Sequence, residues 1–142
     1  MKQYLLFEMA GNKYAIETED IVKIISMRPI TSLPNMSPEI RGIIELEERV
    51  ILVGDMRHIW HRKLQEENLK TSIMIVHFEE QWIGWVVDAV DQVVYFKDEE
   101  ILPIRWEKIV RGKPLIDEAI HYKNQLIGVL SLKKLMTFYK QS

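Results

Sequence analysis

The stretch IELEERVI (residues 44–51) has the pattern of a β-hairpin tip. Ile44 and Leu46 alternate with acidic residues, as in a half-buried strand, and an apolar run over residues 50–53 carries the chain back. The bend falls on Glu47 and Glu48. A two-residue hairpin turn usually needs φ > 0 at its centre, a conformation that Gly or Asn adopts easily and Glu does not. The turn is therefore expected to cost stability and to present two carboxylates on the surface.

Short apolar runs separated by turn residues continue on both sides of this hairpin. Their β-branched and aromatic residues predict strands at residues 3–9, 13–16, 21–27, 71–78 and 82–87, with a turn at Gly11-Asn12 between the first two. The last of these strands is apolar on both faces, which suits a position between two packed sheets. Gly84 inside it indicates a bend or a close approach of backbone.

Helical signals are few and short. Within residues 34–42, Ser37 suits a helix cap, Pro38 a first helical position and Gly42 a left-handed end, so one helical turn is predicted there. A short helix is predicted from Asp55 to about His61.

The C-terminal part ends in an amphipathic helix over residues 131–140. Its apolar positions recur at i, i+3, i+4 and i+7, and they are Leu132, Leu135, Met136 and Tyr139. Residues 62–70 are the most polar stretch of the chain and are expected to form an exposed linker.

The chain also contains a weak internal repeat. When the first part is aligned with the second, the apolar positions Ile16, Ile21, Ile24 and Ile25 correspond to Trp85, Val90, Val93 and Val94. A separate alignment of the hairpin region matches Val50, Met56 and Ile59 with Leu126, Leu132 and Leu135. The hairpin alignment also matches Asp55 with Ser131, and each can cap the helix that follows it. The shared order of strand, strand, hairpin and capped helix favours a duplicated five-strand unit.

Short strands at regular spacing with hairpin turns indicate small barrels or a sandwich. We therefore predict an all-β fold of two five-stranded barrels packed side by side, with little helix. The whole chain, residues 1–142, is expected to be one domain with two intimately packed subdomains at roughly 13–65 and 71–130. The N-terminal strand could be shared between them.

Composition excludes several functional classes. Lys and Arg number 19 against 21 Asp and Glu, for a net charge of −2, so no excess positive charge covers a face that could bind nucleic acid. The absence of cysteine excludes disulfides and thiolate metal sites and suits a reducing cytoplasm. No apolar run reaches the roughly 18 residues that span a bilayer, and the start MKQYLLFEMAG lacks the apolar region of a signal peptide.

Motifs for catalysis or metal binding are missing. His58 and His61 lie one helical turn apart on a predicted helix, but no third ligand is well placed, so a solvated helix face is the better interpretation. No nucleophile motif and no phosphate-binding glycine loop occurs. Trp82 and Trp85 lack interleaved basic residues and are interpreted as core. We expect no catalysis, no cofactor and no metal.

Three segments resemble the CheW-like chemotaxis coupling proteins in their order and spacing: QYLLFEMAGNKYAIETEDIVKII (3–25), IRGIIELEERVILVGDMRHIW (40–60) and IGWVVDAVDQVV (83–94). The resemblance covers essentially the whole chain. It implies two five-stranded SH3-like barrels and a non-catalytic adaptor role. The implied partners are the cytoplasmic tip of methyl-accepting chemoreceptors and the regulatory domain of the histidine kinase CheA, in arrays to which a cytoplasmic adaptor is recruited.

The resemblance also implies a receptor-facing groove between the barrels. Carried over by position, the partner-binding residues are Ile21, Lys23, Ile24, Gly42, Ile43, Val87, Ala89 and Val90, with Glu47 and Glu48 in the hairpin between. For Ile21, Ile24, Val87 and Val90, each taken alone, plain core packing is the stronger alternative.

The chain departs from the family at the hairpin. Where the family typically has Asn-Leu-Arg-Gly, this chain has Glu45-Leu46-Glu47-Glu48, so an Arg is replaced by an acid and the turn Gly is lost. The sign of the charge presented to partners changes, which suggests a paralogue with altered partner choice. The alternative functions are an interaction module of another histidine-kinase pathway, a nucleic-acid-binding barrel and an enzyme with an unrecognised site.

Overall fold

The computed structural model describes residues 1–60, 66–105 and 114–140. The strands of this part are β1 (Lys2–Met9), β2 (Asn12–Glu17), β3 (Ile21–Ser26), β4 (Ile40–Leu46), β5 (Arg49–Asp55), β6 (Ser72–Phe78), β7 (Gln81–Val87), β8 (Ala89–Phe96), β9 (Ile101–Pro103), β10 (Ile116–Tyr122) and β11 (Gln125–Leu130). The helices are α1 (Met56–Trp60) and α2 (Leu132–Lys140), with the 3₁₀ turns η1 (Thr18–Asp20) and η2 (Asp98–Glu100). The predicted all-β architecture with short helices is confirmed.

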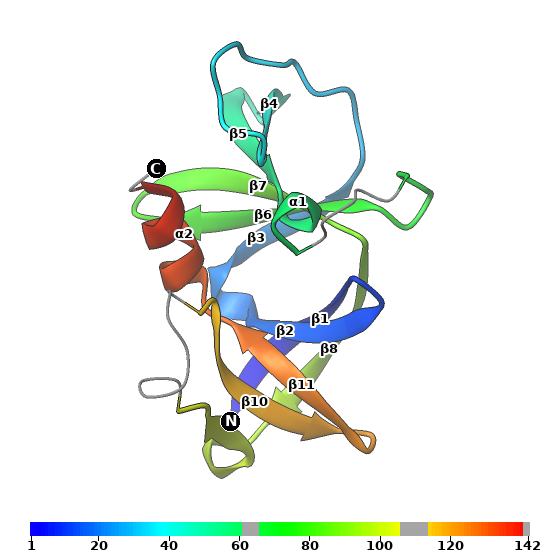
Figure 1. Cartoon of the computed structure of the whole chain (residues 1–142), viewed down its shortest axis with the longest axis vertical. Helices are drawn as coiled ribbons and strands as arrows, with labels where there is room; N and C mark the ends of the chain where they lie inside the picture. The colour runs from blue at the N-terminus through cyan, green and yellow to red at the C-terminus, as the bar shows by residue number, and fades with distance from the viewer. Residues whose placement is uncertain (61–65, 106–113, 141–142) are drawn as a thin grey trace.

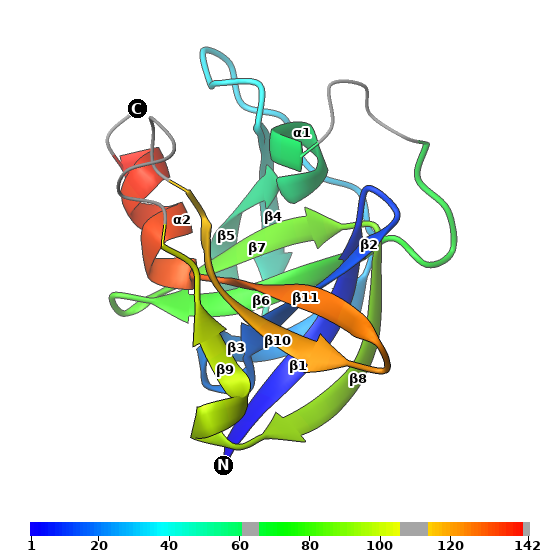
Figure 2. The same cartoon turned by 60° about the horizontal axis from the view of Figure 1, so that its bottom comes forward.

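The strands form two sheets, one above the other in Figure 1. One has six strands in the order β8-β1-β2-β11-β10-β9, and the other has five in the order β3-β6-β7-β5-β4. The sixth strand, β9, is only three residues long and was not predicted. Both sheets are strongly curved (Figure 2).

Side-chain contacts join strands that lie far apart in the strand order of each curved sheet. In the five-stranded sheet, Lys23 of end strand β3 pairs with Glu47 at the tip beyond end strand β4, with 2.6 Å between Nζ and Oε1. In the six-stranded sheet, Gln92 of β8 donates to the hydroxyl of Tyr122 in β10. Closed five-stranded barrels remain a prediction, because the hydrogen-bonded strand orders end at β8 and β9 and at β3 and β4.

The predicted internal repeat is present in the strand pairing. β3-β6-β7-β5-β4 and β8-β1-β2-β11-β10 are the same arrangement built twice. The parallel pairing of Leu52 with Ile83 recurs as the parallel pairing of Gly128 with Tyr14. In the two sequence alignments, Leu52 corresponds to Gly128 and Tyr14 corresponds to Ile83. The bulge between Ile40 and Gly42 recurs in the same way between Ile116 and Glu118.

The two repeats exchange strands. The first repeat (β1 to β5 and α1) gives β1 and β2 to one sheet and β3, β4 and β5 to the other, and the second repeat does the reverse. Residues 21–87 therefore make the five-stranded sheet, while residues 2–17 and 89–130 make the six-stranded one. The predicted subdomain boundaries, 13–65 and 71–130, do not follow the sheets, because η1 and Asp88 each carry the chain from one sheet to the other without a hairpin.

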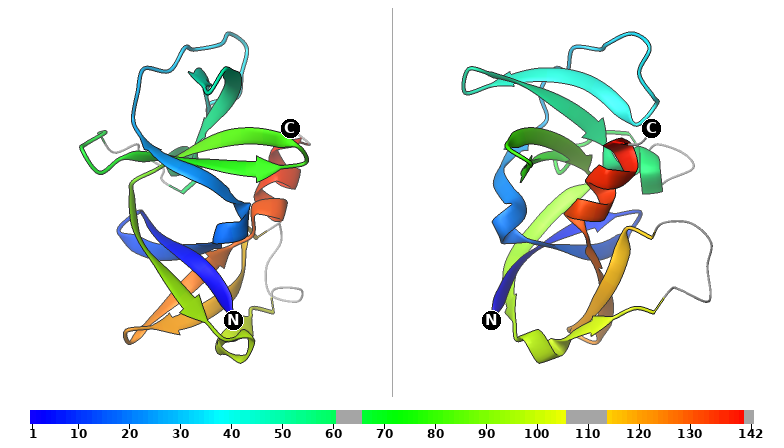
Figure 3. Two further views of the ribbon diagram at one scale, coloured as in Figure 1. Left: turned by 180° about the vertical axis from the view of Figure 1, so that it is seen from behind. Right: turned by 90° about the vertical axis from the view of Figure 1, so that its left-hand side faces the viewer.

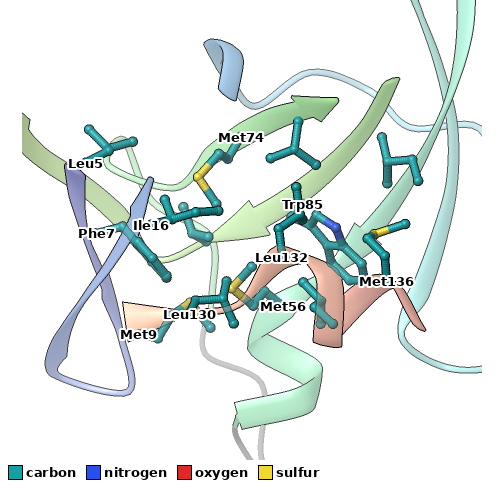
Figure 4. Close-up of a cluster of buried hydrophobic side chains, with 14 residues drawn as sticks. Leu5, Phe7, Met9, Ile16, Met56, Met74, Trp85, Leu130, Leu132 and Met136 are labelled. Atoms are coloured by element: carbon teal, nitrogen blue, oxygen red, sulfur yellow. The ribbon is translucent and has the colours of Figure 1, made fainter. Parts of the chain in front are cut away.

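Three apolar clusters form the core. One lies with the six-stranded sheet and includes Tyr4, Leu6 and Ile120; another lies with the five-stranded sheet and includes Ile51, Ile73 and Val86. The third, here called the central cluster, draws side chains from both sheets and both helices, and Trp85 is its largest member (Figure 4). α2 buries Leu132, Leu135 and Met136 in it from the side, where the two sheets meet (Figure 3).

β7 has the two dry faces that its sequence predicts. Ile83, Trp85 and Val87 face the central cluster, while Val86 faces the cluster of its own sheet. A Cβ on Gly84 would lie 2.8 Å from a methyl of Ile73, so this glycine permits the close packing that was expected. Of the two tryptophans interpreted as core, Trp85 is buried, whereas Trp82 is partly exposed and is covered by the guanidinium of Arg49 at 3.8 Å from the ring centre.

Both predicted helix caps are present. Oδ1 of Asp55 accepts the backbone N–H of Arg57 at 3.0 Å, and Oγ of Ser131 accepts that of Lys134 at 3.2 Å. The helix predicted from Asp55 to about His61 is observed as α1, and His61 lies outside the described residues. Of the predicted linker 62–70, the described residues 66–70 are exposed.

Two local predictions were wrong. Residues 34–42 contain single turns at 34–35 and 38–39 and no helical turn, with the N–H of Ile40 donating to the carbonyl of Ser37 at 2.9 Å. Gly42 lies inside β4, because the chain has already become extended there. The first hairpin turns on Ala10 and Gly11, one residue earlier than predicted.

Asp55 also holds a buried arginine, which no local pattern predicted. Nε and Nη2 of Arg57 donate to the two carboxylate oxygens at 3.0 and 2.9 Å, and Nη1 of Arg41 donates to Oδ2 at 3.0 Å. Arg41 continues to Glu67 at 2.9 Å. Hydrogen bonding to Asp55 raises the pKa of Arg57. The network ties α1 and Glu67 to the β4–β5 hairpin, and removal of one buried partner would leave an uncompensated charge.

The strand exchange predicts that residues 1–65 do not fold alone. That fragment has β1 and β2 of one sheet and β3, β4 and β5 of the other, without the β6 and β7 that join β3 to β5. Several large side chains of the central cluster would be exposed, and each is worth roughly 1.5–3 kcal/mol when buried. Urea titration followed by circular dichroism should show no cooperative transition for 1–65. Mixing 1–65 with 66–142 should restore one, because the exchanged strands pair without a covalent link. A dispersed NMR spectrum from 1–65 alone would contradict this interpretation.

The buried network predicts different costs for the two equivalent caps. Ser131→Ala removes only a cap and should lower the free energy of unfolding by about 1 kcal/mol. Asp55→Ala removes a cap and also leaves Arg57 buried without its carboxylate, so it should cost about 3–5 kcal/mol. Chemical denaturation of both variants measures the difference. Equal costs would mean that the ion pair contributes nothing beyond the cap.

Candidate functional site

Five of the sequence-predicted partner residues gather where the two sheets meet. Ile21 and Ile24 lie on β3, Val87 ends β7, and Ala89 and Val90 begin β8. β3 and β8 are equivalent strands of the two repeats, and each is an end strand of its sheet. We call these five residues the seam. Ile21, Ile24 and Val90 pack against the central cluster that contains Val87.

The seam residues differ in what a partner could reach. Val87 is fully buried and Ala89 nearly so, so Val87 contributes as core, as the alternative interpretation held. Ile21, Ile24 and Val90 are only partly buried. Each of the three packs against the central cluster on one side and is exposed to solvent on the other, so a partner could contact it. The accessible part of the seam is therefore these three apolar side chains.

The other predicted residues form a second surface around the β4–β5 hairpin. Lys23 points toward this hairpin from β3 and pairs with Glu47 at 2.6 Å. Both side chains are about half exposed, at 38% and 51%, so the pair is worth only a few tenths to about 1 kcal/mol. The charge of Glu47 is thus partly matched within the protein, while Glu48 beside it is exposed.

Glu47 and Glu48 do adopt the left-handed conformation that was expected to be costly. Their φ angles are 51° and 63°, and Leu46 pairs directly with Arg49, so the turn has two residues. The same geometry recurs at Glu79 and Glu80, with φ of 47° and 65°. Each non-glycine residue in this region costs about 1–2 kcal/mol, offset by a turn that matches the right-handed strand twist.

Gly42 and Ile43 hold a neighbouring loop against β4. Gly42 has a φ of 144°, and a Cβ there would lie 1.9 Å from the carbonyl oxygen of Thr31, so only glycine fits. Ile43 and Thr31 exchange two backbone hydrogen bonds, at 2.9 and 3.0 Å. Gly42 is buried, so its role on this surface is to shape the backbone.

Three histidines lie in the described part of the chain, and all are exposed: His58, His77 and His121. No three metal-ligating side chains come together among residues 1–60, 66–105 and 114–140. Neither helix of this part has the length and apolar character needed to cross a bilayer.

Comparisons with known proteins agree with this fold and its length. Residues 3–139 match the sequence family described as the CheW-like domain. The chemotaxis protein CheW of Bacillus subtilis (strain 168) is 25% identical over 130 residues, which are 91% of this chain and 83% of that protein. CheW of Klebsiella aerogenes is 22% identical over 102 residues, which are 72% of this chain and 61% of that protein.

A solved structure has the same fold. The scaffolding protein TtCheW from Thermoanaerobacter tengcongensis superposes with a TM-score of 0.83 at 23% sequence identity, over 92% of this chain and 89% of that one. The family match covers both sheets, the exchange of strands between them and both predicted partner surfaces. The chain belongs to the CheW-like family.

Proposed function

We propose that this protein is a non-catalytic adaptor that couples methyl-accepting chemoreceptors to the regulatory domain of the histidine kinase CheA. Its membership of the CheW-like family supports a role in chemotaxis, and the solved relative is described as a scaffolding protein. An adaptor of this kind works in the cytoplasm, where the receptor tips and the kinase meet. It needs binding surfaces and no reactive group.

The observation that carries the proposal is the accessible part of the seam. Ile21 and Ile24 come from one sheet and Val90 from the other, so a rod-like partner lying along the seam would contact both sheets at once. All three rest on the rigid central cluster, which keeps the cost of ordering them on binding low. We propose that the receptor tip binds here.

The β4–β5 hairpin supports a more specific proposal about partner choice. The family's usual Arg at position 47 would meet Lys23, so the Glu in this chain restores an attractive pair. Glu48 remains exposed and replaces a glycine. We propose that the partner of this hairpin presents a basic group toward Glu48, because charge complementarity selects partners more than it adds affinity.

The seam predicts which variants lose receptor binding without unfolding. Ile21→Asp and Val90→Asp should each weaken binding of a receptor-tip fragment about tenfold or more, because an unpaired carboxylate would be desolvated in the contact. Leu126→Asp is the control, since Leu126 is 64% exposed and lies on β11, outside both the seam and the β4–β5 hairpin. Isothermal titration with the receptor fragment, and separately with the kinase regulatory domain, measures the effect.

Stability separates this proposal from plain core packing. Val87→Asp should unfold the protein, whereas Ile21→Asp and Val90→Asp should keep a cooperative melt. If the two folded variants bind the receptor fragment as tightly as the control does, the seam is not the receptor site.

The Lys23–Glu47 pair predicts a charge-swap result. Glu47→Arg should lower the free energy of unfolding by up to about 1 kcal/mol through repulsion of Lys23, and adding Lys23→Glu should restore it. Glu48→Gly alone should stabilise the hairpin, because glycine adopts positive φ without strain. Denaturation of these three variants and of the wild-type protein in low and high salt tests this. If Glu47→Arg combined with Lys23→Glu lowers the free energy of unfolding as much as Glu47→Arg alone does, the two side chains do not interact in solution.

A further inference from the structure

Val90 faces the seam because β8 contains a bulge. Val90 pairs with Phe7 of β1. Val93 pairs with Leu5, so β8 advances three residues while β1 advances two. Phe96 packs in the cluster of the six-stranded sheet, whereas Val90 packs against the central cluster. Positions 90 and 96 would lie on one face of an unbroken strand. The bulge therefore turns Val90 away from the core of its own sheet and toward the seam.

The first repeat has a bulge at the equivalent place. The register of β3 against β6 shifts between Ile21 and Lys23. Ile21 and Ile24 lie three residues apart, yet both pack against the central cluster. Val22, inside this bulge, packs against the cluster of its own sheet. The residue of β8 that corresponds to Val22 is Asp91, so the two bulges share their place in the fold and differ in the side chain that holds them.

Two contacts from the β1–β2 hairpin hold the β8 bulge. Nζ of Lys13 lies 2.7 Å from Oδ2 of Asp91, which directly follows Val90. Oδ2 of Asp88 accepts the backbone N–H of Ala10 at 3.0 Å. Hydrogen bonding to Asp91 raises the pKa of Lys13. The hairpin is thus bonded to the chain on both sides of Val90.

The register without a bulge shows what the Lys13–Asp91 pair opposes. If β8 continued from Val93 without an extra residue, Phe7 would pair with Asp91. Phe7 is fully buried in the central cluster, so the carboxylate of Asp91 would then face apolar side chains. The pair with Lys13 keeps this carboxylate at the surface, where each of the two side chains is 33% exposed.

We infer that Asp91 is a positioning residue for the proposed receptor contact: paired with Lys13, it holds the β8 bulge that presents Val90 in the seam. A change of register by one residue moves a side chain to the opposite face of its sheet. A surface ion pair can therefore control an apolar contact in which it takes no part. The effect on receptor binding rests on the proposed function, whereas the placement of Val90 is a property of the free protein.

Lys13→Glu tests the placement of Val90 in the free, full-length protein by NMR. The new carboxylate repels Asp91, so the methyl signals of Val90 should shift and their NOE contacts with Phe7 should weaken. Adding Asp91→Lys reverses the pair and should return both toward the wild-type values. The methyl signals of Ile24, on the other sheet, should stay in place. Unchanged Val90 signals in Lys13→Glu, or no recovery in the double variant, would overturn the inference.

Lys2→Glu, alone and combined with Glu17→Lys, is the matched control. Lys2 and Glu17 also join β1 to β2, with 3.2 Å between Nζ and Oε1, and their side chains are 49% and 32% exposed. Lys2 pairs with Phe96 of β8, outside the bulge. These variants should leave the Val90 signals and NOE contacts unchanged. Equal changes at Val90 in Lys2→Glu and Lys13→Glu would mean that Asp91 has no special part in placing Val90.

Isothermal titration with the receptor-tip fragment measures the consequence for binding. Lys13→Glu should bind about fivefold more weakly than the wild-type protein, and adding Asp91→Lys should restore most of the affinity. A loss that persists in the double variant would mean that the partner contacts these charges directly. A lower melting temperature with unchanged affinity would show a purely structural role. If Val90→Asp binds as tightly as Leu126→Asp does, the proposed receptor site fails, and the NMR result alone decides whether Asp91 places Val90.

Discussion

The central cluster between the two sheets is the interaction on which the rest of the structure depends. β7 supplies Trp85 to it from one face while its other face closes the core of its own sheet, so neither face can be left in water. Strand exchange makes the dependence mutual, because the first repeat gives two strands to the six-stranded sheet and three to the five-stranded one, and the second repeat gives four and two. The connections are short: η1 after β2, and Asp88 alone after β7. They fix the end strands β3 and β8 beside the central cluster, and the seam is the partly exposed margin of that shared core.

The repeats keep their scaffold and differ in their polar groups. Both have a capped helix after the second hairpin. The carboxylate of Asp55 caps its helix and also accepts hydrogen bonds from the buried Arg57, whereas the hydroxyl of Ser131, its equivalent, caps its helix only. Both have two-residue turns at positive φ, which in this chain fall twice on paired glutamates. Backbone geometry is thus repeated because pairing and packing require it. Charge is free to differ: the turn at Glu47 and Glu48 is acidic, whereas the equivalent turn of the second repeat has Lys123 and Asn124.

Much of the fold could be predicted from sequence because its signals are local. Alternation of apolar residues located most strands, and the caps at Asp55 and Ser131 and the two-faced β7 followed from neighbouring residues alone. The repeat also predicted equivalent pairings. Of the proposed site, sequence could nominate Ile21, Ile24 and Val90, but it could not say that Val87 is wholly buried beside them, because burial depends on what packs from the other sheet.

Tertiary structure alone decided the remaining features. Which strand joins which sheet depends on pairings between residues far apart in the chain, so the subdomain boundaries could not be found from a local pattern. The Lys23–Glu47 pair joins strands that lie far apart in the sequence. An amino-acid sequence determines the period and the turn preference of each segment through local sterics and burial pattern. Charged residues that are far apart in the sequence, such as Lys23 and Glu47, come into contact only when the sheets curve. The sequence alone therefore did not determine which charges pair on the surface.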